Sequence, residues 1–205
     1  MNGETRRTAA LTLALAFGLL AATPAAAMDG SMLLNFDREE LEAEAGETVT
    51  VDLVASTHGN SVGNGIDDLS ATIEYDADVI TVADVEHGPM LAAGDDDATV
   101  DATAEIDDDA GAVTIDQERT PSGSGAKATD TVVTLTLEID DDAPSTTETL
   151  EITDASASYP SDYSLTPVDR DLELSIEGTD DAVPGFVPLT AVVGLAVALW
   201  LLYRR

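Results

Sequence analysis

Short runs of alternating apolar and polar residues, divided by turn sequences, fill the middle of this 205-residue chain. In residues 48–54, Val49, Val51 and Leu53 fall on one face of an extended segment, and residues 69–75 have the same period of two. Similar runs occupy residues 79–85, 98–106, 112–115, 132–139, 150–152 and 172–176. Residues 38–45 are rich in helix formers but precede a turn typical of a strand connection. Many short strands at near-regular spacing predict an all-β sandwich.

The charge of the chain is strongly negative and unevenly distributed. It has 41 Asp and Glu against 8 Lys and Arg. Between Met28 and Val183 there are 40 acids and 4 bases, which leaves a net charge of −36. Such a surface repels nucleic acid, so a nucleic-acid partner is not expected. Self-repulsion is screened only at high ionic strength, so the composition predicts a halophilic protein.

The sequence contains no arrangement of residues typical of catalysis or of a metal site. It has no cysteine, no nucleophile elbow, no HExxH motif and no phosphate loop. His58 and His87 have no ligand-spaced partner, and we expect both to lie in exposed loops. The aspartate runs 95–97, 107–109 and 140–142 suggest Ca²⁺, but residues 107–118 do not match an EF-hand, because Gly111 and Ala112 stand at loop positions five and six. We predict a non-enzymatic protein without a cofactor, since a specific Ca²⁺ site is possible but unsupported.

The first 27 residues have the features of a signal peptide. Arg6 and Arg7 precede an apolar stretch, residues 9–22, that is too short to span a bilayer. Small residues lead up to a predicted cleavage site between Ala27 and Met28. The arginine pair is compatible with either the twin-arginine or the general secretory route.

The last 22 residues have the features of a membrane anchor or a sorting signal. An 18-residue apolar run, residues 186–203, ends in Arg204 and Arg205, which the positive-inside rule places in the cytoplasm. Pro184, Gly185 and Phe186 followed by this run and terminal arginines resemble the PGF-type signal that archaeosortases process in haloarchaea. That resemblance implies removal of residues 184–205 and lipid attachment, whereas the plain alternative is a retained transmembrane helix.

The middle of the chain resembles cohesin domains in the order and spacing of several segments. These are GETVTV at residues 46–51, ATIEYDADVITV at 71–82, VEHGPML at 85–91, GAVTI at 111–115 and VVTLTL at 132–137. Ala77 stands where the family usually has proline. The resemblance spans about residues 33–176 and implies a nine-stranded jelly-roll sandwich. We therefore expect a sandwich domain at residues 28–177 and a short linker at 178–183.

The resemblance also implies a function, because cohesins bind dockerins, which are calcium-loaded modules of a partner protein, through one sheet face. We therefore expect a binding module on the cell surface, anchored to the cytoplasmic membrane and facing outside. The alternative is a carbohydrate-binding module for a cell-surface polysaccharide, linked to polysaccharide breakdown or adhesion. Its candidate contacts are Tyr159 and Tyr163, which flank Pro160, although both tyrosines could instead cap one end of the sandwich. The scarcity of aromatic residues argues against this alternative, since the segment from Met28 to Val183 otherwise has only Phe36 and Tyr75.

Overall fold

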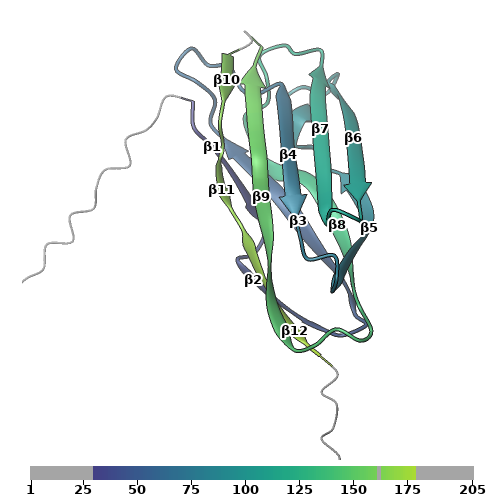
Figure 1. The fold of residues 1–205 in the computed structure, drawn as a ribbon. Coiled ribbons are helices and arrows are strands. Elements are labelled where there is room, and N and C mark those ends of the chain that lie inside the picture. The colour runs from purple at the N-terminus through teal and green to yellow at the C-terminus, as the bar shows by residue number, and fades with distance from the viewer. Residues whose placement is uncertain (1–29, 161–162, 179–205) are drawn as a thin grey trace, which may run out of the picture.

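The computed structural model describes residues 30–160 and 163–178, which form two β-sheets packed face to face (Figure 1). The five-stranded sheet, in the order β11-β1-β3-β8-β5, consists of β1 (Met32–Phe36), β3 (Thr48–Thr57), β5 (Ile80–His87), β8 (Thr129–Ile139) and β11 (Val168–Arg170). The seven-stranded sheet, in the order β2-β12-β9-β4-β7-β6 with β10 also on β9, consists of β2 (Glu40–Glu44), β4 (Asp68–Glu74), β6 (Thr99–Asp107), β7 (Ala112–Thr120), β9 (Thr146–Tyr159), β10 (Tyr163–Leu165) and β12 (Leu172–Glu177). A 3₁₀ turn, η1 (Met90–Ala92), is the only helical element in this part of the chain. The predicted all-β sandwich is confirmed.

The core between the sheets consists of the apolar residues that alternate along each strand. In β4, Leu69, Ala71 and Ile73 are at most 1% exposed, while Ser70 and Thr72 between them are half-buried on the outer face. Val51 and Leu53 of β3 are buried opposite them, as their spacing predicted. Each buried Val, Leu or Ile contributes about 1.5–3 kcal/mol, so the alternation determines which face of each strand turns inward.

Two strands are shared between the sheets. The chain crosses from the five-stranded to the seven-stranded sheet between β1 and β2, and again between β11 and β12. The halves pair in parallel, β1 with β11 and β2 with β12. If each shared strand is counted once and the short β10 is set apart, the described segments amount to nine strands. This agrees with the nine-stranded jelly roll that the resemblance implied.

Three local expectations differ from the structure. Residues 38–45 contain strand β2, which β12 stabilises by parallel pairing that local composition does not reveal. The predicted strand at residues 150–152 is the middle of the fourteen-residue β9. His87 was expected in an exposed loop but ends β5 in a half-buried position, because β8 pairs with it.

The described chain begins and ends at opposite ends of the sandwich (Figure 1). At its last residue, the Gly178 backbone nitrogen donates to Ser145 Oγ at 3.1 Å. A Cβ at this glycine would lie 2.3 Å from backbone atoms of Pro144 and Ser145, so only glycine fits there. No helix within residues 30–160 and 163–178 is long and apolar enough to cross a membrane.

Several predictions concern segments outside the described residues. These are the signal peptide at 1–27, the cleavage site at Ala27 and Met28, the linker beyond Gly178, and the segment 184–205 with Pro184, Gly185 and Phe186.

Candidate partner-binding face

The outer face of β9, β4, β7 and β6 is a broad four-stranded surface with a neutral centre. The strand register places Thr72 between Thr153 and Thr114, and the two threonine hydroxyls of β4 and β7 lie 3.2 Å apart. One row further along, Ser70 lies between Ser156 and Asp116. β4, β6 and β7 contain no aromatic residue. The centre therefore offers hydroxyl groups on rigid strands rather than rings or a deep cavity.

Carboxylates lie at both ends of this face, with Glu74 and Glu151 paired at one end and four acids close together at the other. Glu118 of β7 opposes Asp68 of β4 on one side and Asp101 of β6 on the other, and Asp116 follows in the next row. These residues line a shallow groove of about 420 Å³. Burial, and then repulsion from Asp67, Glu118 and Asp116, raises the pKa of Asp68 above its usual value. The four acids of the groove are named below as the groove acids.

None of the four basic residues in the described part of the chain neutralises the groove acids. Arg38 and Arg170 pair with Asp37 and Glu39 near the sheet crossovers. Lys127 donates to the Gly63 carbonyl in a loop contact. Arg119 is buried beneath η1. The four-stranded face therefore has a negative charge that its own chain leaves uncompensated, which suits a partner with cationic side chains.

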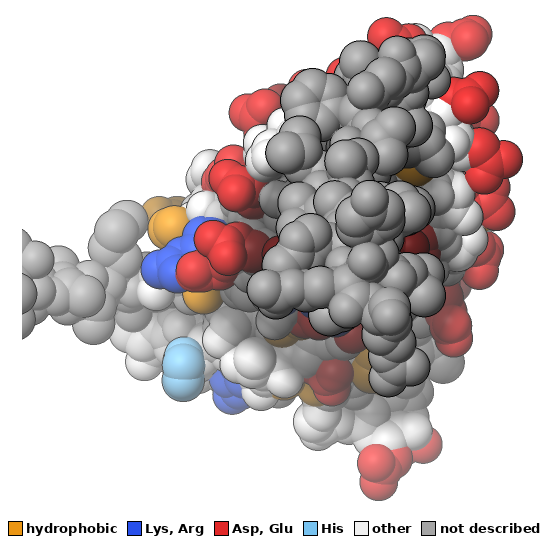
Figure 2. All heavy atoms as spheres, turned by 90° about the horizontal axis from the view of Figure 1, so that it is seen from below, with side chains coloured by type: hydrophobic (Ala, Val, Ile, Leu, Met, Phe, Trp, Pro, Cys, Tyr) orange, Lys and Arg blue, Asp and Glu red, His pale blue; other side chains and the backbone are white. Residues whose placement is uncertain are grey.

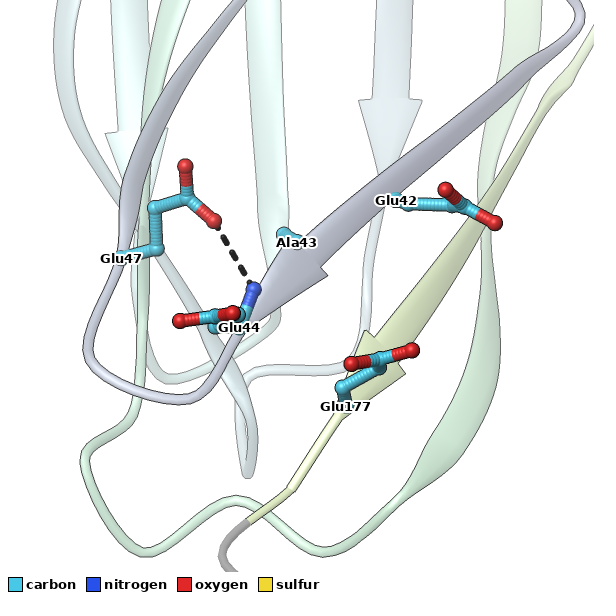
Figure 3. A pocket seen from close by; sticks show the side chains of 5 residues that line it. All are labelled: Glu42, Ala43, Glu44, Glu47 and Glu177. Atoms are coloured by element: carbon cyan, nitrogen blue, oxygen red, sulfur yellow. Dashed lines mark hydrogen bonds between the residues drawn. The ribbon is translucent and has the colours of Figure 1, made fainter.

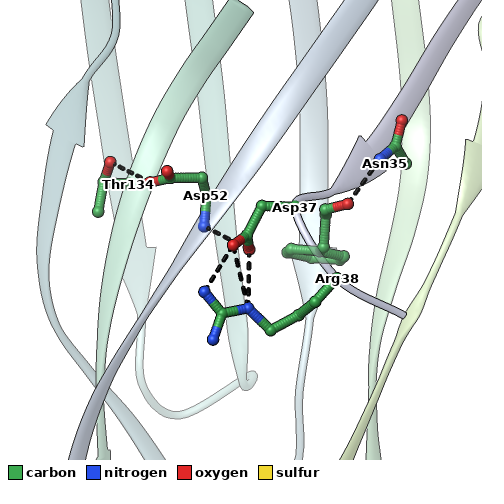
Figure 4. A network of polar contacts seen from close by, with 6 residues as sticks. Asn35, Asp37, Arg38, Asp52 and Thr134 are labelled. Carbon is green, nitrogen blue, oxygen red and sulfur yellow. Dashed lines mark hydrogen bonds and ion pairs between the residues drawn. The ribbon is translucent and has the colours of Figure 1, made fainter. Parts of the chain in front are cut away.

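The outer face of the five-stranded sheet differs at Asp37 and Asp52, whose carboxylates have partners within the chain (Figure 4). Arg38 donates three hydrogen bonds to Asp37, two of them from Nε, and the Asp52 backbone nitrogen donates a fourth at 3.2 Å. Thr134 Oγ1 donates to Asp52 Oδ1 at 2.5 Å. Burial alone would raise the pKa of Asp37, but the bonds from Arg38 and from the Asp52 backbone hold it below its usual value. Asp37 and Asp52 are therefore paired within the chain, whereas Asp84, Glu86 and Glu138 of the same sheet are exposed.

Two polar side chains of β7 point into the sandwich, and the sequence analysis did not single them out. Gln117 and Arg119 are 1% and 2% exposed, and they continue the inward alternation of Val113 and Ile115. Gln117 Nε2 donates to the Val132 carbonyl at 2.8 Å and lies 2.9 Å from His87 Nδ1. Burial lowers the pKa of His87. The period-two spacing of β7 was the available signal for both inward positions.

Arg119 fastens η1 to the sandwich. Its guanidinium donates to the carbonyls of Leu91 and Ala93, and it lies 3.7 Å from the Asp95 carboxylate. Because these acceptors belong to the segment between β5 and β6, one buried charge orders the loop beside β6.

The structure places Tyr159 and Tyr163 together at the end of the sandwich where the described chain begins. Their ring centroids are 6.5 Å apart with planes at 23°. Tyr159 is 2% exposed and belongs to the core, where Gly30 approaches its hydroxyl so closely that a Cβ would lie 2.3 Å away. Tyr163 is 70% exposed. A sugar platform at this end would therefore consist of the Tyr163 ring alone, and the two residues remain a prediction as ligand contacts.

Acidic side chains cover much of the described part of the face that Figure 2 shows. Near the end of β12, Glu42, Glu44, Glu47 and Glu177 line another groove (Figure 3). One Glu47 oxygen accepts a hydrogen bond from the Glu44 backbone nitrogen at 2.9 Å. Within residues 30–160 and 163–178, no three Asp, Glu or His side chains are grouped so as to hold a metal ion.

Comparisons with solved structures agree on the fold. A chain of the type I cohesin–dockerin complex Coh-OlpA–Doc918 from Clostridium thermocellum has a TM-score of 0.59 at 11% identity, covering 72% of this chain and 100% of its own. A chain of the complex Coh-OlpC–Doc435 from the same organism has a TM-score of 0.59 at 18% identity, covering 73% and 95%. The non-cellulosomal cohesin of the hyperthermophilic archaeon Archaeoglobus fulgidus has a TM-score of 0.53 at 11% identity, covering 77% and 99%.

The sequence comparisons bear on the family itself. No protein with a curated description matches the sequence. The cohesin domain family matches residues 35–171, which is most of the described chain and includes all four strands of the candidate face. With the sandwich, the shared strands and the structural neighbours in agreement, the chain belongs to the cohesin domain family.

Proposed function

We propose that this protein is a non-enzymatic binding module that docks a dockerin-type protein on the outer face of β9, β4, β7 and β6. The observation that carries the proposal is a sheet face of a cohesin fold whose groove acids have no basic partner in the described chain and whose strands β4, β6 and β7 contain no aromatic residue. Structural neighbours that are described as cohesin–dockerin complexes support a partner of this class. Any calcium in the complex would come with the partner.

The contrast between the two sheet faces supports this choice of surface. On the five-stranded sheet, Asp37 and Asp52 already have donors within the chain. On the four-stranded face, the groove acids have no basic neighbour in the described chain, and the central hydroxyls of Ser70 and Thr72 remain accessible at half-buried positions. A partner with lysine or arginine side chains toward the ends of its contact surface and hydrogen-bonding groups at its centre would complement this face.

We further propose that the module is exported and held at the outer surface of the cytoplasmic membrane in a high-salt environment. This part rests on the sequence of both termini and on the net charge of −36 between Met28 and Val183. Processing by an archaeosortase at Pro184, Gly185 and Phe186 would replace the C-terminal segment by lipid. The six residues 178–183 span about 20 Å at most, so the sandwich would stand close to the membrane.

The proposal is tested by capture from the secreted proteins of the source organism. The full chain is immobilised in molar salt, and retained proteins are identified by mass spectrometry. We expect enrichment of a protein with a dockerin module, removed by chelation of Ca²⁺ and regained when Ca²⁺ is returned. Capture that Asp116→Lys leaves intact would contradict the proposed face, and recovery of no such protein would contradict the proposed partner.

A further inference from the structure

A β-bulge interrupts the middle of the candidate face. Thr72 of β4 pairs with Thr153 of β9, but Ser70 pairs with Ser156, so Asp154 and Ala155 together oppose Ala71. Ala155 is half-buried and packs against the core, which makes Asp154 the additional residue. Asp154 is exposed and has φ = 49°, the left-handed conformation of the first residue in a bulge that normally takes glycine.

The residue type at this position is unusual for its backbone. Eight other residues in the described chain have positive φ, and all eight are glycine. Aspartate tolerates the left-handed region better than most residues, yet glycine adopts it without a steric penalty. The aspartate carboxylate makes no hydrogen bond or ion pair with another described residue, so local bonding does not account for the choice. Position 154 therefore carries an aspartate side chain although its backbone conformation favours glycine.

The position of Asp154 gives that side chain a use. It follows Thr153 in the row of Thr153, Thr72 and Thr114, away from the groove acids, while Glu74 in the next row accepts a hydrogen bond from Thr153 Oγ1. Bulges turn a side chain out of the regular pleat, and strained residues persist where the surrounding structure holds them for a purpose. No basic residue of the described chain lies on this face.

We infer that Asp154 is an anchor residue of the partner-binding face, whose carboxylate accepts a charge-assisted hydrogen bond from a lysine or arginine of the docked dockerin-type protein. The inference rests on the proposed function. The bulge holds this carboxylate at a fixed point beside the threonine row, out of the regular alternation of the strand, so it specifies where the partner's cation must lie.

Two substitutions separate the carboxylate from the backbone. Asp154→Asn keeps the shape and the tolerance for positive φ but removes the charge, whereas Asp154→Gly keeps the bulge without a side chain. Asp84→Asn on the outer face of the five-stranded sheet is the matched control, since Asp84 is also an exposed strand residue beside a register shift. The probe is the protein retained in the capture experiment, purified and titrated against each full-length variant in molar salt.

We expect Asp154→Asn and Asp154→Gly each to raise the dissociation constant about tenfold, and Asp84→Asn to change it less than about twofold. Thermal unfolding of Asp154→Gly should begin at a higher temperature than that of the wild type, because the strained conformation is relieved. A partner that binds both Asp154 variants as tightly as the wild type overturns this inference alone. If the wild type captures no dockerin-type partner, the proposed function fails and this inference fails with it.

Discussion

The two outer faces of the sandwich are made of similar residues but differ in how their charges are used. On the five-stranded sheet, Asp37 is held by Arg38 and by the Asp52 backbone, and its pKa is lowered. On the four-stranded face, burial and then repulsion from neighbouring acids raise the pKa of Asp68. The same residue type is therefore stabilised on one face and repelled on the other. A surface that leaves repulsion in place is available to a partner that removes it.

The largest expected effect concerns salt, because every acid of the domain contributes to it. The net charge of −36 between Met28 and Val183 should unfold the protein when salt falls well below about 1 M, where screening is lost. Replacing Asp68, Asp116 and Glu118 by their amides should lower the salt needed for folding. A circular-dichroism melt that is the same in about 0.1 M and about 3 M salt would contradict this predicted salt dependence.

Charge reversal should separate the faces in binding. Asp116→Lys places a positive charge in the groove, where we expect a cationic partner, and should weaken capture more than about 100-fold. Asp84→Lys makes the same change on the five-stranded sheet and should leave capture within about twofold. Surface plasmon resonance with the captured protein measures both. Equal losses would show that the faces do not differ as proposed.

Neutralising one acid on each face should change stability in opposite directions. Asp37→Asn removes the negative charge and one of the two oxygens that accept from Arg38, and should lower the free energy of unfolding by about 0.2–1 kcal/mol, the range of a surface ion pair. Asp68→Asn removes a repelled charge and should raise it by a few tenths of a kcal/mol, since Asp68 is largely exposed. Denaturant titrations at constant molar salt measure both. The same sign for the two variants would contradict the contrast.

The smallest effect is the dependence of these differences on pH. The folded-state pKa of Asp68 is above the ordinary value of 3.8, so its unfavourable contribution is relieved as pH falls through that raised pKa. The folded-state pKa of Asp37 is below 3.8, so its favourable contribution is complete above 3.8 and is lost as pH falls through the lowered pKa. As pH falls, the stabilities of the wild type and Asp68→Asn should therefore converge between the raised pKa and 3.8. Those of the wild type and Asp37→Asn should converge only below 3.8. Unfolding midpoints measured from about pH 3 to 6 test this order.

Gln117 and Arg119 show what the local sequence pattern could not predict, namely the partners of buried polar side chains. Their spacing placed them on the buried side of β7, but a polar side chain is accepted there only because Val132, Leu91 and Ala93 offer carbonyl acceptors. Those acceptors come from other segments of the chain. No pattern within β7 predicts them.

The sequence by itself determined the class of fold and most of the core. Residues such as Leu69, Ile73 and Val51 could be assigned to the interior because a strand turns successive side chains to opposite faces, which is a local property of the backbone. The order of segments also determined the family. Both depend on patterns that are complete within a few residues or in their spacing along the chain.

Only the tertiary structure decided which acids are paired and which are left repelling one another. The four groove acids come from three strands, and their proximity depends on the register between β4, β7 and β6. The same holds for Asp154, whose extra position exists only relative to Ala71 on the neighbouring strand. Pairing of distant strands is set by the packing of the whole sandwich, and this is why the candidate face could not be chosen from the sequence.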